Sequence, residues 1–283
     1  LFPDIPFIHG DLLIPEQVCT AMRGIRSVIH LAALKAAGDS MLEPERYALH
    51  NLNGTVNLLH AAGTAGVRHF VFSSSAAVYG EPQYLPLDEN HPTEPANFYG
   101  QTKLQIEMLL SWFSRLRNMR YVGLRYFNAA GYDPDGEVRG LEKEPNNLLP
   151  LVLETLLGWR ENLEVYGTDY DTEDGSCIRD YIHVSDLADA HLRALNFLEE
   201  HDEDLVVNLG TSKGISVLEI LDAARKVSGM DLPVIHSDRR PGDPAVVLAS
   251  SEKAERLLEW SPAFSDVKTI LKTMLAAYRS HHR

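Results

Sequence analysis

The sequence predicts an α/β protein: a doubly wound parallel sheet with a smaller C-terminal α/β part. Short apolar runs alternate with amphipathic stretches of helical spacing through the first two thirds of the 283 residues. The runs end in small or polar residues, as buried parallel strands do where they open onto a site. Near Asn146 the alternation becomes less regular. This change separates a first part, residues 1–145, from a second part, residues 146–283, some segments of which return to the sheet.

The elements follow from these patterns in chain order. Apolar runs predict strands over residues 27–32, 69–73 and 121–127, and a further strand leading into Asp11. Helical spacing with few internal glycines predicts crossover helices over residues 44–65 and 98–116. The second part is predicted to hold helices over 148–159, 184–199, 217–228 and 267–278, with short strands near Val165 and Val207. Residues 167–175 and 239–244 carry glycine, aspartate and proline and are predicted loops.

Composition excludes several classes of protein. There are 26 Lys and Arg against 40 Asp and Glu, and the net charge of −14 disfavours nonspecific binding to nucleic acid or anionic membranes. No stretch approaches the roughly 18 apolar residues of a membrane span, and the first 15 residues do not resemble a secretory signal. Cys19 and Cys177 cannot form a disulfide framework and lack zinc-ligand spacing. We therefore expect a cytoplasmic protein without a metal site.

The strongest chemical signal is Tyr99 followed four residues later by Lys103 near the start of a predicted helix. This spacing places both side chains on one helix face. An ammonium beside a phenol lowers the pKa of the phenol, so Tyr99 is a candidate general base. Ser73, Ser74 and Ser75 end the preceding predicted strand. A hydroxyl there would face the same crevice and could orient a substrate proton.

Tyr-x-x-x-Lys with an upstream serine resembles the short-chain dehydrogenase/reductase superfamily, and further stretches resemble its extended branch, in particular the UDP-glucose 4-epimerases. The stretches occur in family order over nearly the whole chain: Gly10–Leu12, His30–Ala36, Asn51–Thr55, Phe72–Gly80, Arg125–Asn128, Asn146–Leu148 and Tyr166–Val184. The resemblance implies an NAD-binding Rossmann-like domain at 1–145 and a mainly substrate-binding part at 146–283. It also implies a homodimer, to which the helix over 98–116 could contribute.

The implied reaction interconverts UDP-glucose and UDP-galactose. The sugar is oxidised at C4, the 4-keto sugar rotates, and hydride returns to the other face. Tyr99 would be the base and Ser75 would hydrogen-bond the reacting oxygen. Lys103 would hold the nicotinamide ribose and, together with the positive nicotinamide, lower the pKa of Tyr99. A loosely held sugar needs a tightly held diphosphate, so binding energy should concentrate on the diphosphate.

The resemblance assigns further residues to the two ligands. Those implied for NAD are Asp11, Leu12, Leu31, Ala32, Ala33, Leu34, Lys35, Asn51, Ser73, Tyr126 and Phe127, in addition to Tyr99 and Lys103. Those implied for the UDP-sugar are Asn128, Asn147, Leu148, Val165, Tyr166, Arg179, Arg240, Asp243 and Val247, in addition to Ser75 and Tyr99. Two arginine forks, Arg179 and Arg240, suit a diphosphate. For Asn51 the residue type alone favours a position on a helix surface.

Val247 occupies the position of the family's gatekeeper residue, where a bulky tyrosine is associated with rejection of N-acetylhexosamines. Valine leaves room, so the resemblance raises the hypothesis that UDP-N-acetylglucosamine is a second substrate. A buried strand residue with no part in specificity is the alternative reading of Val247.

The sequence departs from the family pattern at its start. No two of the 19 glycines are separated by a single residue, so the glycine-rich phosphate turn is absent, and the first residue is Leu. We expect roughly 50 residues, including strands of the sheet, to be missing from the printed sequence. Two alternatives therefore stay open. One is another sugar-nucleotide enzyme such as a UDP-glucuronate epimerase or decarboxylase, against which residues 172–175 argue. The other is a catalytically silent protein that binds a nucleotide sugar.

Overall fold

A computed structural model describes residues 4–240 and 242–281. Pro241, in the predicted loop over 239–244, lies outside the described residues. Among the described helices, none combines the length and apolar character that crossing a bilayer requires.

The main sheet has four parallel strands in the order β1-β2-β3-β8. They are β1 (Ser27–His30), β2 (His69–Ser75), β3 (Arg120–Tyr126) and β8 (Leu205–Leu209). The predicted strands over 27–32, 69–73 and 121–127 and near Val207 are therefore confirmed. β2 and β3 are buried along most of their length, because helices cover both of their faces. In register, Ser75 pairs with Tyr126, and Tyr126 pairs with Leu209, so these strands end together at one edge of the sheet.

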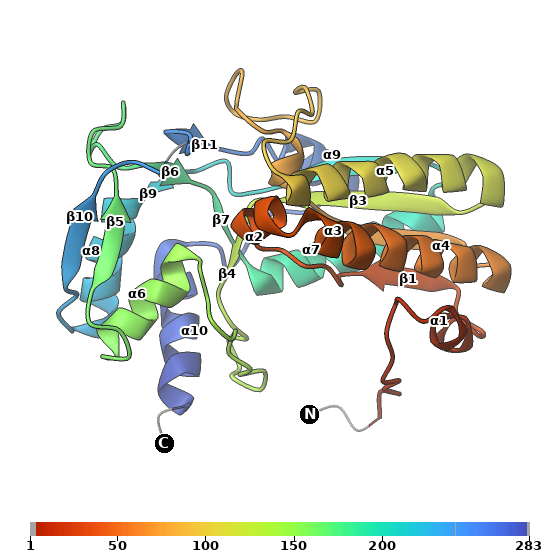
Figure 1. Cartoon of the computed structure of the whole chain (residues 1–283), viewed down its shortest axis with the longest axis horizontal. Helices are drawn as coiled ribbons and strands as arrows, with labels where there is room; N and C mark the ends of the chain where they lie inside the picture. Colours follow the sequence, from red (N-terminus) through yellow and green to blue (C-terminus); the bar gives the residue numbers. More distant parts are fainter. Residues whose placement is uncertain (1–3, 241, 282–283) are drawn as a thin grey trace.

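Helices pack on both faces of this sheet, which confirms the doubly wound prediction (Figure 1). On one face, α1 (Pro15–Ala21), α4 (Gly54–Ala65) and α5 (Phe98–Arg117) cover β1 and β2 around Phe70 and Phe72. On the other face, α7 (Val184–Glu200) and α9 (Glu252–Leu258) pack against Val122, Leu124 and Val207. The sheet is thus a rigid platform whose strand ends remain available for a site.

The predicted helix over 44–65 is a continuous helical run of three segments. It comprises α3 (Pro44–Tyr47), the π-helical η1 (Ala48–Asn53) and α4. A short helix that the sequence did not predict, α2 (Ala37–Leu42), precedes it. The π-helical segment carries Asn51, which is its one buried residue and is 1% exposed. The residue-type expectation of a surface position for Asn51 is therefore wrong.

The second part forms its own core at the side of the molecule opposite α4 and α5 (Figure 1). Its helices α6 (Leu148–Leu156), α8 (Val217–Ser228) and α10 (Val267–Ser280) match three predicted helices, and α7 matches the fourth. Its short strands form three small sheets, one of them with β4 (Asn128–Ala130) of the first part. In these sheets β5 (Leu163–Tyr166) pairs with β10 (Val234–Ser237), β6 (Ile178–Arg179) lies between β11 (Val246–Val247) and β9 (Ile215–Ser216), and β7 (Tyr181–His183) pairs with β4.

The strand predicted to lead into Asp11 is wrong. Residues 6–11 form neither helix nor strand, and Phe7 is 86% exposed. A strand exists only where a neighbour accepts its backbone hydrogen bonds, and none of the described strands pairs with this segment. The segment instead leads to α1, whose Val18 packs into the core below β1.

Candidate active site

The start of α5 is held against the end of β2, and this contact brings the candidate base to the candidate serine. Asn97 caps the helix by accepting a hydrogen bond from the Gly100 amide at 2.9 Å. A Cβ at Gly100 would lie 2.3 Å from the Ala77 carbonyl oxygen, so only glycine permits this approach. Ala77 belongs to the 3-10 turn η2 (Ala76–Val78), which follows Ser75 directly. The short distance places Tyr99 beside Ser75.

Lys103 lies one turn along α5 from Tyr99, as the sequence spacing predicted. Its ammonium Nζ donates a hydrogen bond to the Ser73 carbonyl oxygen at 2.7 Å and lies 5.7 Å from the centroid of the Tyr99 ring. It also lies 4.9 Å from the centroid of the Phe72 ring. The side chain is buried. The structure therefore brings Ser75, Tyr99 and Lys103 together at the carboxyl edge of the sheet.

In this structure burial raises the pKa of Tyr99 to about 12, and hydrogen bonding to Ser75 is the contribution that lowers it. The lowering of this pKa by Lys103 together with the positive nicotinamide stays a prediction. Burial also lowers the pKa of Lys103 to about 8, although Glu107 acts in the opposite direction.

A cavity of about 910 Å³ opens at this edge of the sheet. Its walls come from the ends of β2 and β3, the segment 127–142 and α6. The predicted residues that line it are Lys35, Ser75, Tyr99, Tyr126, Phe127, Asn128, Asn147 and Leu148. A volume of this size suits a ligand of several rings. Residues predicted for both ligands thus share one cavity.

A second cavity of about 520 Å³ lies along the end of β1. It is lined by five residues predicted for NAD: Asp11, Leu12, Ala32, Ala33 and Leu34. The small alanines leave the backbone open to close approach, which a dinucleotide requires. Leu34 and Lys35 are adjacent, so this cavity adjoins the larger one. The small lining residues of this cavity therefore fit the close approach of a dinucleotide. Leu31 is 62% exposed and is not among the residues that line the cavity.

Two of the residues predicted for NAD are buried and bonded to protein. The Asn51 amide accepts from Leu34 N at 2.8 Å and donates to Leu34 O at 3.0 Å and to Thr102 Oγ1 at 3.2 Å. Asn51 thereby ties the loop after β1 to α5. The Ser73 hydroxyl lies 2.9 Å from Nε2 of His191 on α7. Neither residue is among the described residues that line the two cavities.

The remaining predicted substrate residues gather on the small sheets of the second part. Arg179 and Asp243 form an ion pair, and Val247 pairs with Arg179 in register. Arg240 lies over the Tyr166 ring, 3.9 Å from its centroid. Val165 precedes Tyr166 on β5 and is buried. Arg179 thus lies on β6 and Arg240 in the loop between β10 and β11, and neither is among the residues that line the large cavity.

Comparison with known proteins identifies the family. Residues 2–210 match the model of the NAD dependent epimerase/dehydratase family. The chain belongs to this family. It is 42% identical over 280 residues to a UDP-glucose 4-epimerase of Halalkalibacterium halodurans, a match that spans 98% of this chain and 84% of that protein.

Solved structures agree. A UDP-glucose 4-epimerase from Brucella ovis in complex with NAD superposes with a TM-score of 0.93 at 40% identity, over 95% of this chain and 83% of that one. One from Bifidobacterium longum in complex with NAD+ and UDP superposes with a TM-score of 0.89 at 37% identity, over 96% and 82%. The predicted fold class and the resemblance to this branch are confirmed.

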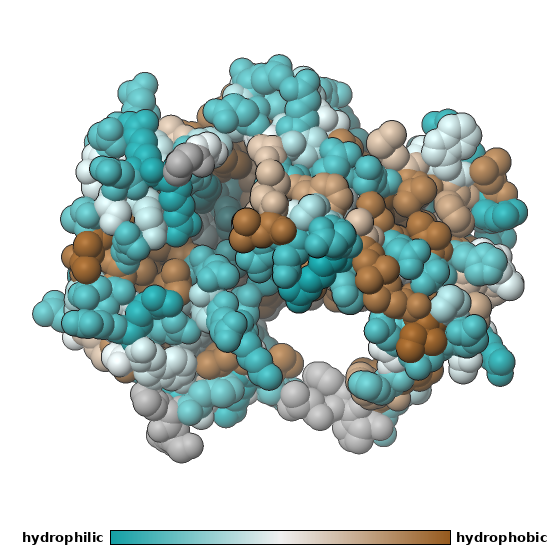
Figure 2. Space-filling model, in the orientation of Figure 1, coloured by the Kyte–Doolittle hydropathy of each residue, from teal (hydrophilic) through white to brown (hydrophobic). Residues whose placement is uncertain are grey.

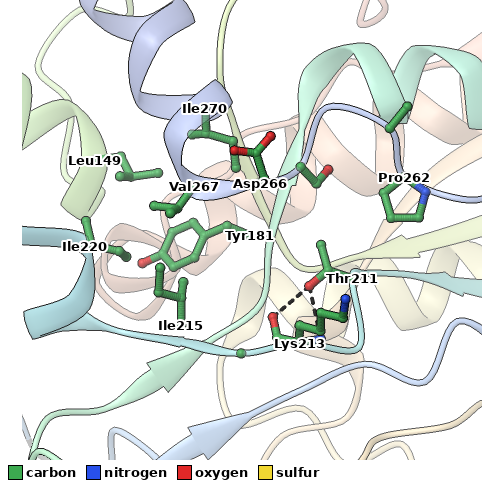
Figure 3. A pocket seen from close by; sticks show the side chains of 13 residues that line it. Leu149, Tyr181, Thr211, Lys213, Ile215, Ile220, Pro262, Asp266, Val267 and Ile270 are labelled. Atoms are coloured by element: carbon green, nitrogen blue, oxygen red, sulfur yellow. Dashed lines mark hydrogen bonds between the residues drawn. The ribbon is translucent and has the colours of Figure 1, made fainter. Parts of the chain in front are cut away.

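The sequence analysis did not identify Tyr181 as a residue of the candidate site. It lines the large cavity and also a neighbouring cavity of about 350 Å³. Figure 3 shows the Tyr181 ring among Leu149, Ile215 and Ile220, which line the cavity of about 350 Å³. Burial raises the pKa of its phenol. No local pattern marked it, because Arg179 and Tyr181 lie on different short strands, β6 and β7.

Glu142 is a second missed residue. Its carboxylate forms an ion pair with Lys35 Nζ at 2.7 Å, and both residues line the large cavity. Lys35 follows β1, whereas Glu142 lies in the loop between β4 and α6. The pair therefore joins the loop after β1 to the loop before α6.

Proposed function

We propose that this chain catalyses the NAD-dependent interconversion of UDP-glucose and UDP-galactose. The observation that carries the proposal is the meeting of Ser75, Tyr99 and Lys103 at the carboxyl edge of the sheet. There Ser75 and Tyr99 line a cavity of about 910 Å³, which adjoins a second cavity suited to a dinucleotide. The 42% identity to a UDP-glucose 4-epimerase supports the choice of reaction within the family.

Tyr99 would remove the proton of the sugar 4-hydroxyl, and Ser75 would hydrogen-bond the same oxygen. NAD, when bound, supplies the acceptor and later the donor of the hydride that leaves C4. The C4–O bond becomes a carbonyl as proton and hydride leave, and both return after the sugar has turned its other face. Tyr99 returns the proton, so the protein ends each cycle unchanged. Lys103 would keep a positive charge beside Tyr99 and hold the nicotinamide ribose.

Residues 1–145 would provide mainly the NAD side, and residues 146–283 mainly the substrate side. The NAD side would comprise the Asp11–Leu12 turn, the Leu31–Lys35 loop, Asn51, Ser73, Tyr126 and Phe127. On the substrate side, Arg179 and Arg240 would hold the diphosphate, while Asn128, Asn147, Leu148, Val165, Tyr166 and Asp243 complete the pocket. Binding Arg179 to a diphosphate requires exchange of its ion pair with Asp243. The freed carboxylate would then meet the uridine ribose.

The side chain of Val247 is the basis for proposing a second substrate. Val247 pairs with Arg179 in register and packs against the buried cluster of Val78, Tyr79 and Leu87. A short side chain here leaves space that a tyrosine would fill, which supports acceptance of UDP-N-acetylglucosamine beside UDP-glucose.

A homodimer is part of the same proposal. Met108, Trp112 and Leu116 recur every fourth residue on α5 and are 59%, 58% and 67% exposed. Val56 of the neighbouring α4 is 40% exposed. Figure 2 shows apolar surface over the side of the molecule that carries α4 and α5. A second copy would cover this stripe. The free cysteines Cys19 and Cys177 suit the proposed cytoplasmic location.

The test is direct. The protein, expressed from its complete gene, should carry bound NAD and convert UDP-galactose to UDP-glucose. Tyr99→Phe should retain the fold and NAD while turnover falls by about 10³-fold, because general-base catalysis contributes on that order. A folded, NAD-containing wild type that does not interconvert the two sugars would overturn the proposal.

A further inference from the structure

A chain of buried polar side chains runs behind the serines at the end of β2. Ser74 Oγ donates to Glu107 Oε1 at 2.5 Å, and Arg125 grips the same carboxylate through Nε at 3.0 Å and Nη2 at 2.6 Å. Arg125 Nη1 donates to Tyr79 Oη at 3.0 Å, and Tyr79 Oη donates to Asn208 Oδ1 at 2.6 Å. All five residues are at most 7% exposed.

The chain is joined to the reacting groups at two points. Ser74 lies between Ser73, whose carbonyl holds the Lys103 ammonium, and Ser75, which hydrogen-bonds Tyr99. Glu107 lies four residues after Lys103 and eight after Tyr99 on α5, so these three side chains share one helix face. A rotation of α5 about its axis would therefore move Glu107 and Tyr99 together.

The strands supply a fixed base for this contact. Ser74 pairs with Arg125, and Arg125 pairs with Asn208, on the adjacent strands β2, β3 and β8. The bidentate geometry of Arg125 on Glu107 permits a single orientation of the carboxylate. A buried ion pair is a poor source of net stability, which favours a role in geometry.

We propose that Glu107, clamped by Ser74 and Arg125, is a positioning residue for the epimerisation: it sets the rotation of α5 that aims Tyr99 and Lys103 at Ser75. This inference rests on the proposed function, because the orientation of Tyr99 and Lys103 affects turnover only if they act in that reaction. Glu107 is not among the described residues that line the two cavities, so it acts through its neighbours.

The charge of Glu107 adds a second consequence. Its carboxylate raises the pKa of Lys103, opposing burial. The other titratable groups around Lys103 are His30 of β1, Tyr99 of α5, Arg125 of β3 and, through Ser73, His191 of α7. Burial lowers the pKa of His30 to about 4, so His30 is neutral near pH 7, and burial also lowers the pKa of His191. Glu107 is thus the negative charge that favours the Lys103 ammonium.

The first experiment compares two serines with matched contacts on α5. Ser74→Ala removes a buried hydroxyl that donates to the Glu107 carboxylate, and Ser114→Ala removes one that donates to Asp204 at 2.8 Å at the far end of the helix. We expect Ser74→Ala to lower kcat by about 10-fold with KM within about twofold, since small misplacements of reacting groups are costly. Ser114→Ala should leave kcat within about twofold.

The second experiment removes the clamp without leaving an unpaired charge. In the double variant Glu107→Met with Arg125→Met, two apolar side chains replace the ion pair, an exchange that folded proteins tolerate. We expect kcat to fall by about 100-fold, with the alkaline limb of the kcat profile at lower pH than in the wild type. A purely structural role would lower Tm and leave the pH of that limb unchanged.

The outcomes separate the two claims. A wild type that does not turn over UDP-galactose overturns the proposed function itself. An active wild type whose Ser74→Ala and Ser114→Ala variants have equal kcat overturns the positioning role, even when the double variant fails to fold.

Discussion

Replacing Lys103 with methionine should make the protein more stable and inactive. The ammonium is 3% exposed, and burial lowers the pKa of Lys103 from 10.5 to about 8. A displacement of that size corresponds to about 3 kcal/mol of unfavourable free energy for the charged form in the folded state. Methionine fills a similar volume without charge.

The net gain is smaller, because the variant also loses the hydrogen bond from Nζ to the Ser73 carbonyl, at a cost of about 1–2 kcal/mol. We expect Lys103→Met to raise the free energy of unfolding at pH 7 by about 1–2 kcal/mol, or Tm by about 2–8 °C. The sign follows from proton binding: between pH 8 and 10.5 the unfolded wild type binds more protons than the folded one, so wild-type stability rises with pH. The advantage of the variant should shrink over that interval.

Urea unfolding at pH 7 and at pH 10, on both proteins after removal of bound nucleotide, measures this difference. Turnover of UDP-galactose at pH 7 should be lost in the variant. A variant less stable than the wild type at pH 7, or an advantage that does not diminish at pH 10, would show that burial of the Lys103 charge is not the dominant contribution.

Three further changes test other contacts. Gly100→Ala places a Cβ 2.3 Å from the Ala77 carbonyl and should reduce the unfolding free energy by about 1–3 kcal/mol in urea titrations; Gly63→Ala, whose nearest neighbour is 3.8 Å away, should not destabilise the protein. Val247→Tyr should lower turnover of UDP-N-acetylglucosamine by about 10-fold or more relative to UDP-glucose, and a wild-type turnover ratio below about one in a thousand would contradict the proposal. Trp112→Glu should shift the protein from dimer to monomer in sedimentation velocity, whereas Leu192→Glu on α7 should not.

The elements that are predicted best from the sequence are those whose burial requires a long run or a regular spacing of apolar residues. β2 and β3 are buried apolar runs, and α10 shows apolar residues at regular helical spacing, so each was recognisable alone. The two-residue strands β6, β9 and β11 are too short for any periodicity, because they exist only through pairing with each other. The short helices α1 and α2 were missed for the same reason.

The candidate site divides in the same way. Tyr99 and Lys103 were found because helix geometry makes their spacing meaningful within one element. Glu142 faces Lys35 across 107 positions, and no local pattern reports such a contact. The effect of burial on the pKa of Tyr99 could not be predicted, because spacing shows which charge is near but not how deeply the phenol is buried.

The path of the chain has a consequence for any attempt to divide this protein. After β3 the chain leaves the main sheet, returns with α7 and β8, departs again through β9, α8 and β10, and comes back with α9 before ending in α10. Each half therefore lacks pieces that the other half's sequence supplies. A single cut near residue 145 would leave β3 without its neighbour β8 and the sheet without α7. The two halves of the chain that line the cavity must consequently be expressed and folded as one unit.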